Sequence, residues 1–222
     1  MLPVAILVDQ DGTMIDSEPI WERAERAMTE SLGGVLTSEA REKMIGGPLR
    51  DTALLMLELS GADVDPADIE NGLVAEVARL VGEDVPWMEA APGFLARAGE
   101  MGVPVGLVTS SWRRITEVVA AAAPAPGFAA VVAGDDVARP KPAPDAYLEG
   151  ARRFGAPIER CLIVEDSPTG IRAAVASGAV VAVVPGVVEV PPSEEYSRFA
   201  SLDELTGEVV ERLIAGERFD LV

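Results

Sequence analysis

The stretch LVDQDGTMIDSEP, residues 7–19, places two aspartates, Asp9 and Asp11, two residues apart at the end of an apolar run. The run itself, residues 3–8, has the composition of a buried strand. Burying one carboxylate is unfavourable, and burying two like charges together is more so, unless a cation or a reaction requires them there. The stretch therefore predicts a buried strand that ends at a functional site.

The overall charge limits the partners of this chain. It has 222 residues and a formal net charge of −19, from 18 Lys and Arg against 37 Asp and Glu. The length is enough for one large core, or for a core domain with a smaller inserted domain. A strongly acidic surface argues against nucleic acids and anionic membranes, since both are polyanions. An anionic substrate would have to be met by a bound metal or by a few well-placed basic side chains.

Rare and absent residue types restrict the chemistry further. The sequence has no histidine, which excludes His-containing triads and His-rich zinc sites. The single cysteine, Cys161, lies in an apolar run and is expected to be a buried structural thiol. The first strand begins at residue 3 without a basic flank, and no apolar run is long enough to cross a membrane. We expect a cytoplasmic enzyme.

Short apolar runs alternate with longer amphipathic segments along most of the chain, which is typical of an α/β domain with a parallel sheet. The predicted strands are residues 4–8, 103–108, 129–133, 161–164 and 179–184. The predicted helices of this domain are residues 94–101, 115–123, 145–154, 168–177 and 203–215, the last capped by Ser201. The Pro- and Glu-rich segment 187–199 is expected to be a surface loop.

One long segment, residues 18–87, interrupts this alternation. It contains four helix patterns, at residues 20–32, 38–45, 50–59 and 66–81, but no convincing strand. Glycines divide these patterns from one another. We therefore expect a helical domain at residues 18–87, inserted after the first strand of a core formed by residues 1–17 and 88–222.

The residues just after the predicted strands are rich in carboxylates and hydroxyls. Parallel α/β sheets place functional residues at the carboxyl ends of their strands, so we expect these groups to share one edge. Converging carboxylates imply a hard divalent cation, and oxygen ligands favour Mg²⁺. A Lys there would meet a phosphoryl oxygen or a carboxylate, and a Thr would donate a hydrogen bond to the same group. The residues concerned are Asp9, Asp11, Thr109, Ser110, Lys141, Glu165 and Asp166.

Each of these residues taken singly has a simpler explanation. A strand-end aspartate often only caps the following helix, and the hydroxyls after the second strand could do the same. Lys141, between two prolines, could be a solvated loop charge. The polar residues that follow the first four predicted strands, taken together and in this order, favour phosphoryl transfer.

Four ordered motifs resemble those of the haloacid dehalogenase-like phosphohydrolases, in the subgroup close to β-phosphoglucomutase. They are ILVDQDGTMIDSEP, VGLVTSS, ARPKPAPDAY and LIVEDSPTGIRAA, and the resemblance covers essentially the whole chain. It implies a Rossmann-like parallel-sheet core with an inserted α-helical cap domain.

The resemblance also implies a role for each motif residue. Asp9 would be the nucleophile and a Mg²⁺ ligand, and Asp11 the general acid and base, giving the metal only its backbone carbonyl. Thr109 and Lys141 would hold the transferring phosphoryl group, with Ser110 beside them. Asp166 would complete the metal site, with Glu165 as a direct or indirect ligand.

Two arginines and two departures from the family pattern bear on substrate and reaction. Arg50, in the cap segment that should select the substrate, and Arg113, after the second motif, are candidate substrate contacts. Gln10 stands where the family usually has an apolar residue, and we expect it to alter packing rather than chemistry. Trp21 stands where mutase members carry a histidine, which favours a hydrolase.

The leading hypothesis is a Mg²⁺-dependent phosphatase that acts on a small phosphorylated metabolite, such as a sugar or polyol phosphate, through an aspartyl phosphate on Asp9. The alternative is a hexose-phosphate mutase like β-phosphoglucomutase. A dehalogenase would have no use for Asp11 or the acidic pair, and a binding protein without turnover would have lost Asp9, Lys141 or Asp166. We expect the enzyme to work as a monomer.

Overall fold

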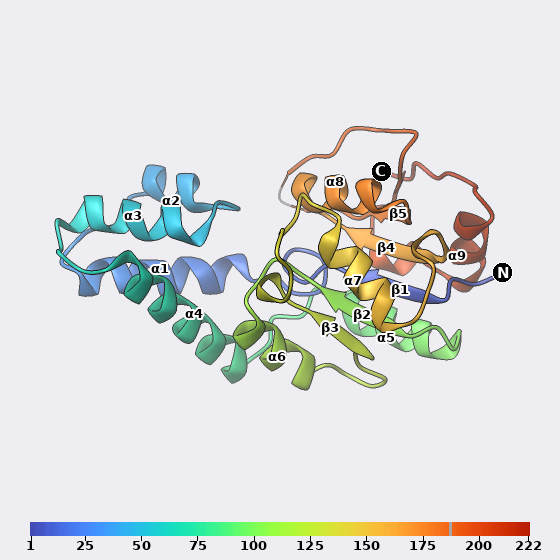
Figure 1. Ribbon diagram of the computed structural model, residues 1–222, viewed down its shortest axis with the longest axis horizontal. Helices are drawn as coiled ribbons and strands as arrows, with labels where there is room; N and C mark the ends of the chain where they lie inside the picture. The colour runs from blue at the N-terminus through green and yellow to red at the C-terminus, as the bar shows by residue number, and fades with distance from the viewer. Residues whose placement is uncertain (187) are drawn as a thin grey trace. The chain divides into compact units, whose positions relative to one another are not determined.

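The computed structural model describes residues 1–186 and 188–222, and the chain divides into two compact units (Figure 1). The first unit comprises Met1–Asp16 and Val85–Val222, and the second comprises Ser17–Asp84. The helical insertion was predicted at residues 18–87. Each unit is described by itself below.

In its described residues, the first unit is built on a six-stranded parallel sheet. Its strands are β1 (Ala5–Val8), β2 (Val105–Val108), β3 (Ala130–Val132), β4 (Cys161–Glu165), β5 (Val180–Val183) and β6 (Ser197–Arg198). They lie in the order β3-β2-β1-β4-β5-β6. The strand β1 lies at the centre and is buried along its whole length. Uniform burial explains why its sequence is continuously apolar rather than alternating.

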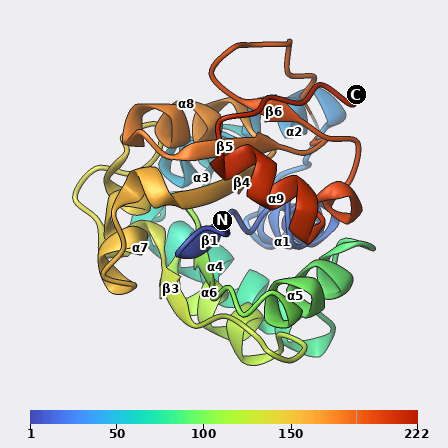
Figure 2. The same cartoon turned by 90° about the vertical axis from the view of Figure 1, so that its right-hand side faces the viewer.

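Helices cover both faces of this sheet. On one face, α7 (Asp145–Arg153) and α8 (Pro168–Ser177) pack against strand residues such as Leu7, Val108 and Ile163. On the other face lie α5 (Ala91–Glu100) and α9 (Gly207–Ile214), and α6 (Arg113–Ala121) connects β2 to β3 (Figure 2). The described residues of this unit also form the 3₁₀ turns η1 (Gly134–Asp136), η2 (Ile158–Arg160) and η3 (Leu202–Glu204).

The register of the sheet brings the predicted site residues to one edge. Val8 pairs with Leu107 of β2 on one side and with Val164 of β4 on the other. The residues that follow these positions therefore emerge side by side, as expected for parallel strands. Cys161 is fully buried, as expected, and burial raises the pKa of its thiol to about 11.

Two expectations for the C-terminal part were wrong. The predicted helix 203–215 is interrupted: Ser201 caps the short turn η3, and Thr206 starts α9 by accepting a hydrogen bond from the Val209 amide at 3.4 Å. The segment 187–199 is not entirely loop, because β6 pairs with β5 and Phe199 is fully buried against Phe219. Val187 lies outside the described residues.

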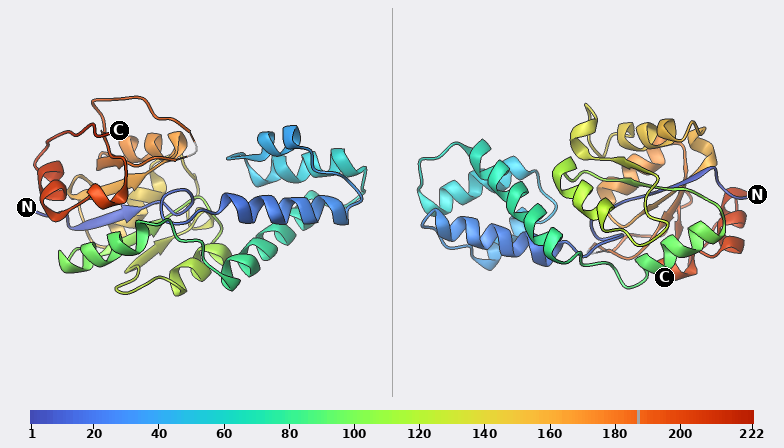
Figure 3. Two further views of the ribbon diagram at one scale, coloured as in Figure 1. Left: turned by 180° about the vertical axis from the view of Figure 1, so that it is seen from behind. Right: turned by 90° about the horizontal axis from the view of Figure 1, so that it is seen from below.

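The second unit is a bundle of four helices, α1 (Glu18–Ser31), α2 (Ser38–Met44), α3 (Leu49–Ser60) and α4 (Pro66–Glu83), shown from two further sides in Figure 3. Buried side chains of α3 and α4, including Met56, Leu73 and Val77, form its core. Thr37 and Asp65 cap α2 and α4 by accepting backbone N–H bonds, as their sequence positions suggest. In the described part of the chain, no helix is long and apolar enough to span a bilayer.

Candidate active site

A buried lysine lies at the edge of the sheet where the predicted site residues emerge. Lys141 reaches from the loop before α7, and its Nζ donates to Asp9 Oδ1 at 2.5 Å, to Glu165 Oε1 at 2.7 Å and to the Val108 carbonyl at 3.0 Å. These three bonds use all three donors of the ammonium group. The ammonium group also lies over the ring of Tyr147, whose centroid is 4.7 Å from Nζ. The solvated-loop explanation for Lys141 is therefore wrong.

Glu165 is completely buried and is held by hydrogen bonds on both oxygens. Oε1 accepts from Lys141 and from the Tyr147 hydroxyl at 2.6 Å. Oε2 accepts from the Asp166 amide and from the Ser167 amide and hydroxyl, each at 3.1 Å. With five donors in place, the carboxylate has little remaining capacity to bind a metal directly, and its position supports Lys141 and the turn into α8.

Asp166 lies in a tight cradle. Its Oδ1 accepts a hydrogen bond from the Thr13 hydroxyl at 2.8 Å. A Cβ at Gly12 or at Gly186 would come within 2.3 Å or 2.4 Å of its Oδ2, so both positions require glycine. Gly12 also has φ +87°, in the region that glycine alone adopts easily. The backbone thus closes around the Asp166 carboxylate and fixes its direction.

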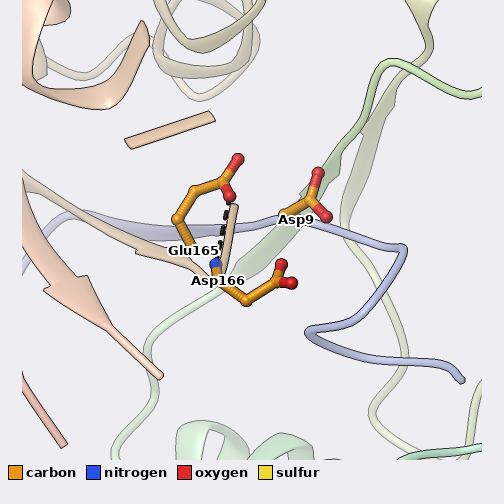
Figure 4. Close-up of side chains that lie close together, drawn as sticks. All are labelled: Asp9, Glu165 and Asp166. Atoms are coloured by element: carbon orange, nitrogen blue, oxygen red, sulfur yellow. Dashed lines mark hydrogen bonds between the residues drawn. The ribbon is translucent and has the colours of Figure 1, made fainter. Parts of the chain in front are cut away.

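Three carboxylates converge in this region (Figure 4). Oxygen atoms of Asp9, Glu165 and Asp166 all lie within 4.8 Å of one another. Burial raises the pKa of Asp9 well above its usual range, with Lys141 acting in the opposite direction and Glu165 adding to the increase. Burial, followed by the charge of Glu165, raises the pKa of Asp166 to about 7. One lysine does not neutralise this cluster, and its oxygen donors fit a hard divalent cation, with Asp9 and Asp166 as the available ligands.

Asp11 is only partly buried, unlike Asp9. Its Oδ2 accepts from the Ser111 hydroxyl at 2.6 Å, from the Gln10 amide at 3.2 Å and from the Thr109 hydroxyl at 3.3 Å. Thr109 also accepts from the Ser111 amide at 2.9 Å. The two aspartates of the opening motif therefore have different surroundings: Asp9 faces an ammonium group and Asp11 faces neutral donors.

The second motif contributes differently from the prediction. Thr109 is buried beside Asp11, as a residue at the end of β2 should be. Ser110 is exposed, and Ser111 instead contacts Asp11. Ser110 was predicted as a substrate contact, which this arrangement does not test. The local turn decides which hydroxyl of the run Thr109-Ser110-Ser111 meets Asp11.

The two candidate arginines are held by ion pairs elsewhere. The Arg113 guanidinium binds Asp136, with Nε to Oδ1 at 2.9 Å, and also Glu117 at 3.2 Å. Arg50 belongs to the helical unit, where it pairs with Glu70 at 2.9 Å and remains half exposed. None of these three ion pairs involves Asp9, Glu165 or Asp166.

Three supporting residues escaped the sequence analysis. They are Thr13, which donates to Asp166, Tyr147, which donates to Glu165, and Ser167, which donates to Glu165 and caps α8. Each lies inside one of the four motifs quoted above. Their partners are far apart in the chain, or depend on a helix turn, so the motif alone gave no signal for the contacts.

Comparison with known proteins supports the family resemblance that the four motifs indicated. A family model described as haloacid dehalogenase-like hydrolase matches residues 4–178. The fructose-1-phosphate phosphatase YqaB of Escherichia coli is 31% identical over 177 residues, which cover 78% of this chain and 92% of the relative. Hexitol phosphatase A of E. coli is 29% identical over 201 residues, 90% of this chain and 92% of the relative.

Solved structures give the same fold. The crystal structure of CbbY from Rhodobacter sphaeroides in complex with phosphate superposes with a TM-score of 0.80 at 26% identity, covering 95% of this chain and 99% of that one. The α/β fold expected from the four motifs is therefore confirmed.

Proposed function

This chain belongs to the haloacid dehalogenase-like hydrolases and is a phosphohydrolase, and we propose that it is a Mg²⁺-dependent phosphatase that forms an aspartyl phosphate on Asp9. One observation carries the proposal, namely the different surroundings of the two aspartates. Asp9 contacts the buried Lys141 and belongs to the carboxylate cluster that also contains Glu165 and Asp166. The Asp11 carboxyl instead accepts hydrogen bonds from neutral donors. With a cation bound to offset the raised pKa of Asp9, this separation suits an ionised nucleophile and an acid that exchanges a proton.

In the first step, an Asp9 carboxylate oxygen attacks the phosphorus atom, and the bond from phosphorus to the substrate oxygen breaks. Asp11 gives its proton to the departing alkoxide. Lys141 offsets the negative charge on Asp9 and on the phosphoryl oxygens, and Thr109 donates a hydrogen bond to them.

In the second step, water attacks the phosphorus atom of the aspartyl phosphate. Asp11, now ionised, takes a proton from that water, and the bond between phosphorus and Asp9 breaks to release inorganic phosphate. Asp11 is thereby protonated again and Asp9 is again a carboxylate, so the cycle balances.

Asp9, Asp166 and the backbone carbonyl of Asp11 would hold the Mg²⁺, with Glu165 in support. When bound, the cation supplies charge neutralisation between the carboxylates and the phosphoryl oxygens. The excess of buried carboxylates over cations at this point supports its presence.

For the substrate, we propose a sugar or polyol phosphate, because the named relatives are phosphatases of fructose 1-phosphate and hexitol phosphates. The helical unit Ser17–Asp84 would act as a cap that selects it. Arg50 is a candidate contact there, and Arg113 is another, which would first have to leave Asp136. The enzyme would work as a monomer. The absence of a histidine at Trp21 favours hydrolysis over the mutase alternative.

The proposal is tested by phosphate release from a panel of sugar and polyol phosphates with Mg²⁺ present, with Asp9→Asn as the control. We expect turnover by the wild type and none above background by the variant. Interconversion of hexose phosphates faster than phosphate release, dependent on a bisphosphate activator, would instead support the mutase. No turnover of the panel or of p-nitrophenyl phosphate would contradict the proposal.

A further inference from the structure

Gln10, between the two aspartates, has an unusual position for an amide side chain. The residue is fully buried, with no exposed surface. An apolar side chain would fill such a position at no electrostatic cost, whereas a buried amide is unfavourable unless it is hydrogen-bonded. The sequence led us to expect a packing role, and the contacts of the amide indicate a different one.

The side-chain amide of Gln10 donates its hydrogen bonds to the Asp11 carboxyl. Its Nε2 lies 3.2 Å from Asp11 Oδ2 and 3.4 Å from Oδ1, and within the described residues its Oε1 has no hydrogen-bond partner. The backbone of Gln10 is fixed separately, because its carbonyl accepts from the amides of Met14 and Ile15 at 2.9 and 3.0 Å. The only hydrogen bonds that compensate the buried amide therefore go to Asp11.

Ser111 completes the arrangement from the end of β2. Its hydroxyl donates to Asp11 Oδ2 at 2.6 Å, the shortest of the bonds to that carboxyl. Gln10 and Ser111 approach from the ends of two neighbouring strands, β1 and β2. A partly exposed carboxyl without fixed partners samples several orientations, and donors from the ends of two strands restrict it to one.

We propose that Gln10 is a positioning residue that, together with Ser111, holds the Asp11 carboxyl in the orientation from which it protonates the leaving group. The inference rests on the proposed phosphatase function, in which Asp11 delivers that proton. Gln10 itself is buried and does not touch the substrate.

The dependence on the leaving group separates this role from a structural one. An alkoxide departs only if it receives a proton, whereas p-nitrophenolate departs readily without one. Misplacing Asp11 should therefore slow hydrolysis of an alkyl phosphate and spare p-nitrophenyl phosphate. The ratio kcat/KM is the appropriate quantity, since it includes the steps up to departure of the leaving group and excludes the later attack by water.

The experiment compares the wild type with Gln10→Met, which keeps the volume and removes the amide, on a hexitol phosphate and on p-nitrophenyl phosphate. We expect kcat/KM to fall roughly tenfold or more for the hexitol phosphate and by less than about twofold for p-nitrophenyl phosphate. Ser111→Ala, a small change at a partly exposed residue, should give the same selective loss. Ser177→Ala, which removes a buried hydrogen bond at the end of α8, should leave kcat/KM unchanged for both substrates.

Equal losses on both substrates, or no loss in either variant, would overturn the role of Gln10. Failure of the proposed function looks different, because the wild type itself would then hydrolyse neither compound. If Gln10→Met does not fold, the selectivity of Ser111→Ala still decides whether donors to Asp11 act on the leaving group.

Discussion

Each unit of the molecule contains a buried ion cluster, and the two clusters differ in how they are compensated. In the helical unit, Arg41 of α2 lies between Glu18 and Glu25 of α1, at 2.6 and 3.0 Å. Glu25 is nearly as buried as Glu165, yet its Oε2 and the Arg41 Nε have no aligned hydrogen bond. In the α/β unit, Glu165 accepts five hydrogen bonds from surrounding donors.

The two clusters differ in the frame around their carboxylates. Arg41 joins two helices, and burial raises the pKa of Glu25 to about 7, with Arg41 acting in the opposite direction. The pKa values of Asp9 and Asp166 are raised as well, but their cluster lies at strand ends, and fixed donors and glycine cradles keep its carboxylates close together. Carboxylates held together in a rigid frame are suited to bind a cation.

Removing the central lysine should have the largest effect. Lys141→Met leaves Asp9 and Glu165 without their cation, so we expect kcat to fall by about 10³-fold or more and the free energy of unfolding to fall by about 3–5 kcal/mol. Phosphate release and urea unfolding measure the two effects. Arg139→Met, two residues away in an exposed ion pair, is the control and should cost at most about 1 kcal/mol. Full activity of Lys141→Met would place the catalytic charge elsewhere.

The pH dependence of stability should show that Glu25 keeps its proton in the folded protein. An unfolded chain loses this proton near pH 4.5, whereas the folded protein keeps it to about pH 7. The folded state therefore binds more protons in this window, and its stability falls as the pH rises through it. The change is on the order of 3 kcal/mol at most, and Glu25→Gln should remove it.

Urea unfolding at several pH values from 5 to 8 measures this difference between the wild type and Glu25→Gln. Asp9 and Asp166 contribute a slope of the same sign to both proteins, so the subtraction isolates Glu25. Parallel curves for the two proteins would mean that Glu25 does not keep its proton in the folded state.

Metal binding should distinguish the two clusters directly. At a Mg²⁺ concentration of 100 times Kd, binding stabilises the folded state by about 2.7 kcal/mol. We expect this gain in the wild type and in Glu25→Gln, and its loss in Asp166→Asn. Thermal unfolding with Mg²⁺ or with EDTA measures it, and a Mg²⁺ response in Asp166→Asn equal to that of the wild type would place the metal at other ligands.

The smallest expected effect concerns the hydroxyl of Tyr147. It shares Glu165 Oε1 with Lys141, so Tyr147→Phe lets Glu165 draw the ammonium more strongly away from Asp9. We expect kcat to fall about three- to tenfold with little change in KM, the pattern for an interaction that matters in the transition state. Tyr196→Phe, which loses a comparable hydrogen bond to the Pro191 carbonyl, is the matched control. Equal effects of the two variants would make Tyr147 merely structural.

The sequence predicted those parts of the molecule that depend on chain order. Parallel strands place their ends at one edge, so the sequence alone assigned Asp9, Thr109 and Glu165 to a common site. The four helices of the second unit were predicted from their apolar patterns and the glycines between them. The structure adds that Thr37 and Asp65 cap two of these helices by accepting backbone N–H bonds.

The remainder depends on contacts between distant residues or on local turns. Ser111 rather than Ser110 meets Asp11 because the turn after β2 decides which side chain faces inward. The pairing of β6 with β5 depends on burial of Phe199 against a residue near the C-terminus, which a segment rich in Pro and Glu does not suggest. The hydrogen bond from the Gln10 side chain to Asp11 is likewise evident only in the three-dimensional structure, because the sequence does not show where the amide lies.

The central claim is that Asp9 accepts the phosphoryl group while Asp11 carries the proton. Acid quenching of the enzyme during turnover, followed by peptide mapping with mass spectrometry, tests it most directly. We predict one added phosphoryl group on the peptide that contains Asp9, present in the wild type with Mg²⁺ and absent in Asp9→Asn. Phosphate release by Asp9→Asn at the wild-type rate, or a phosphoryl group trapped on another residue, would contradict the account.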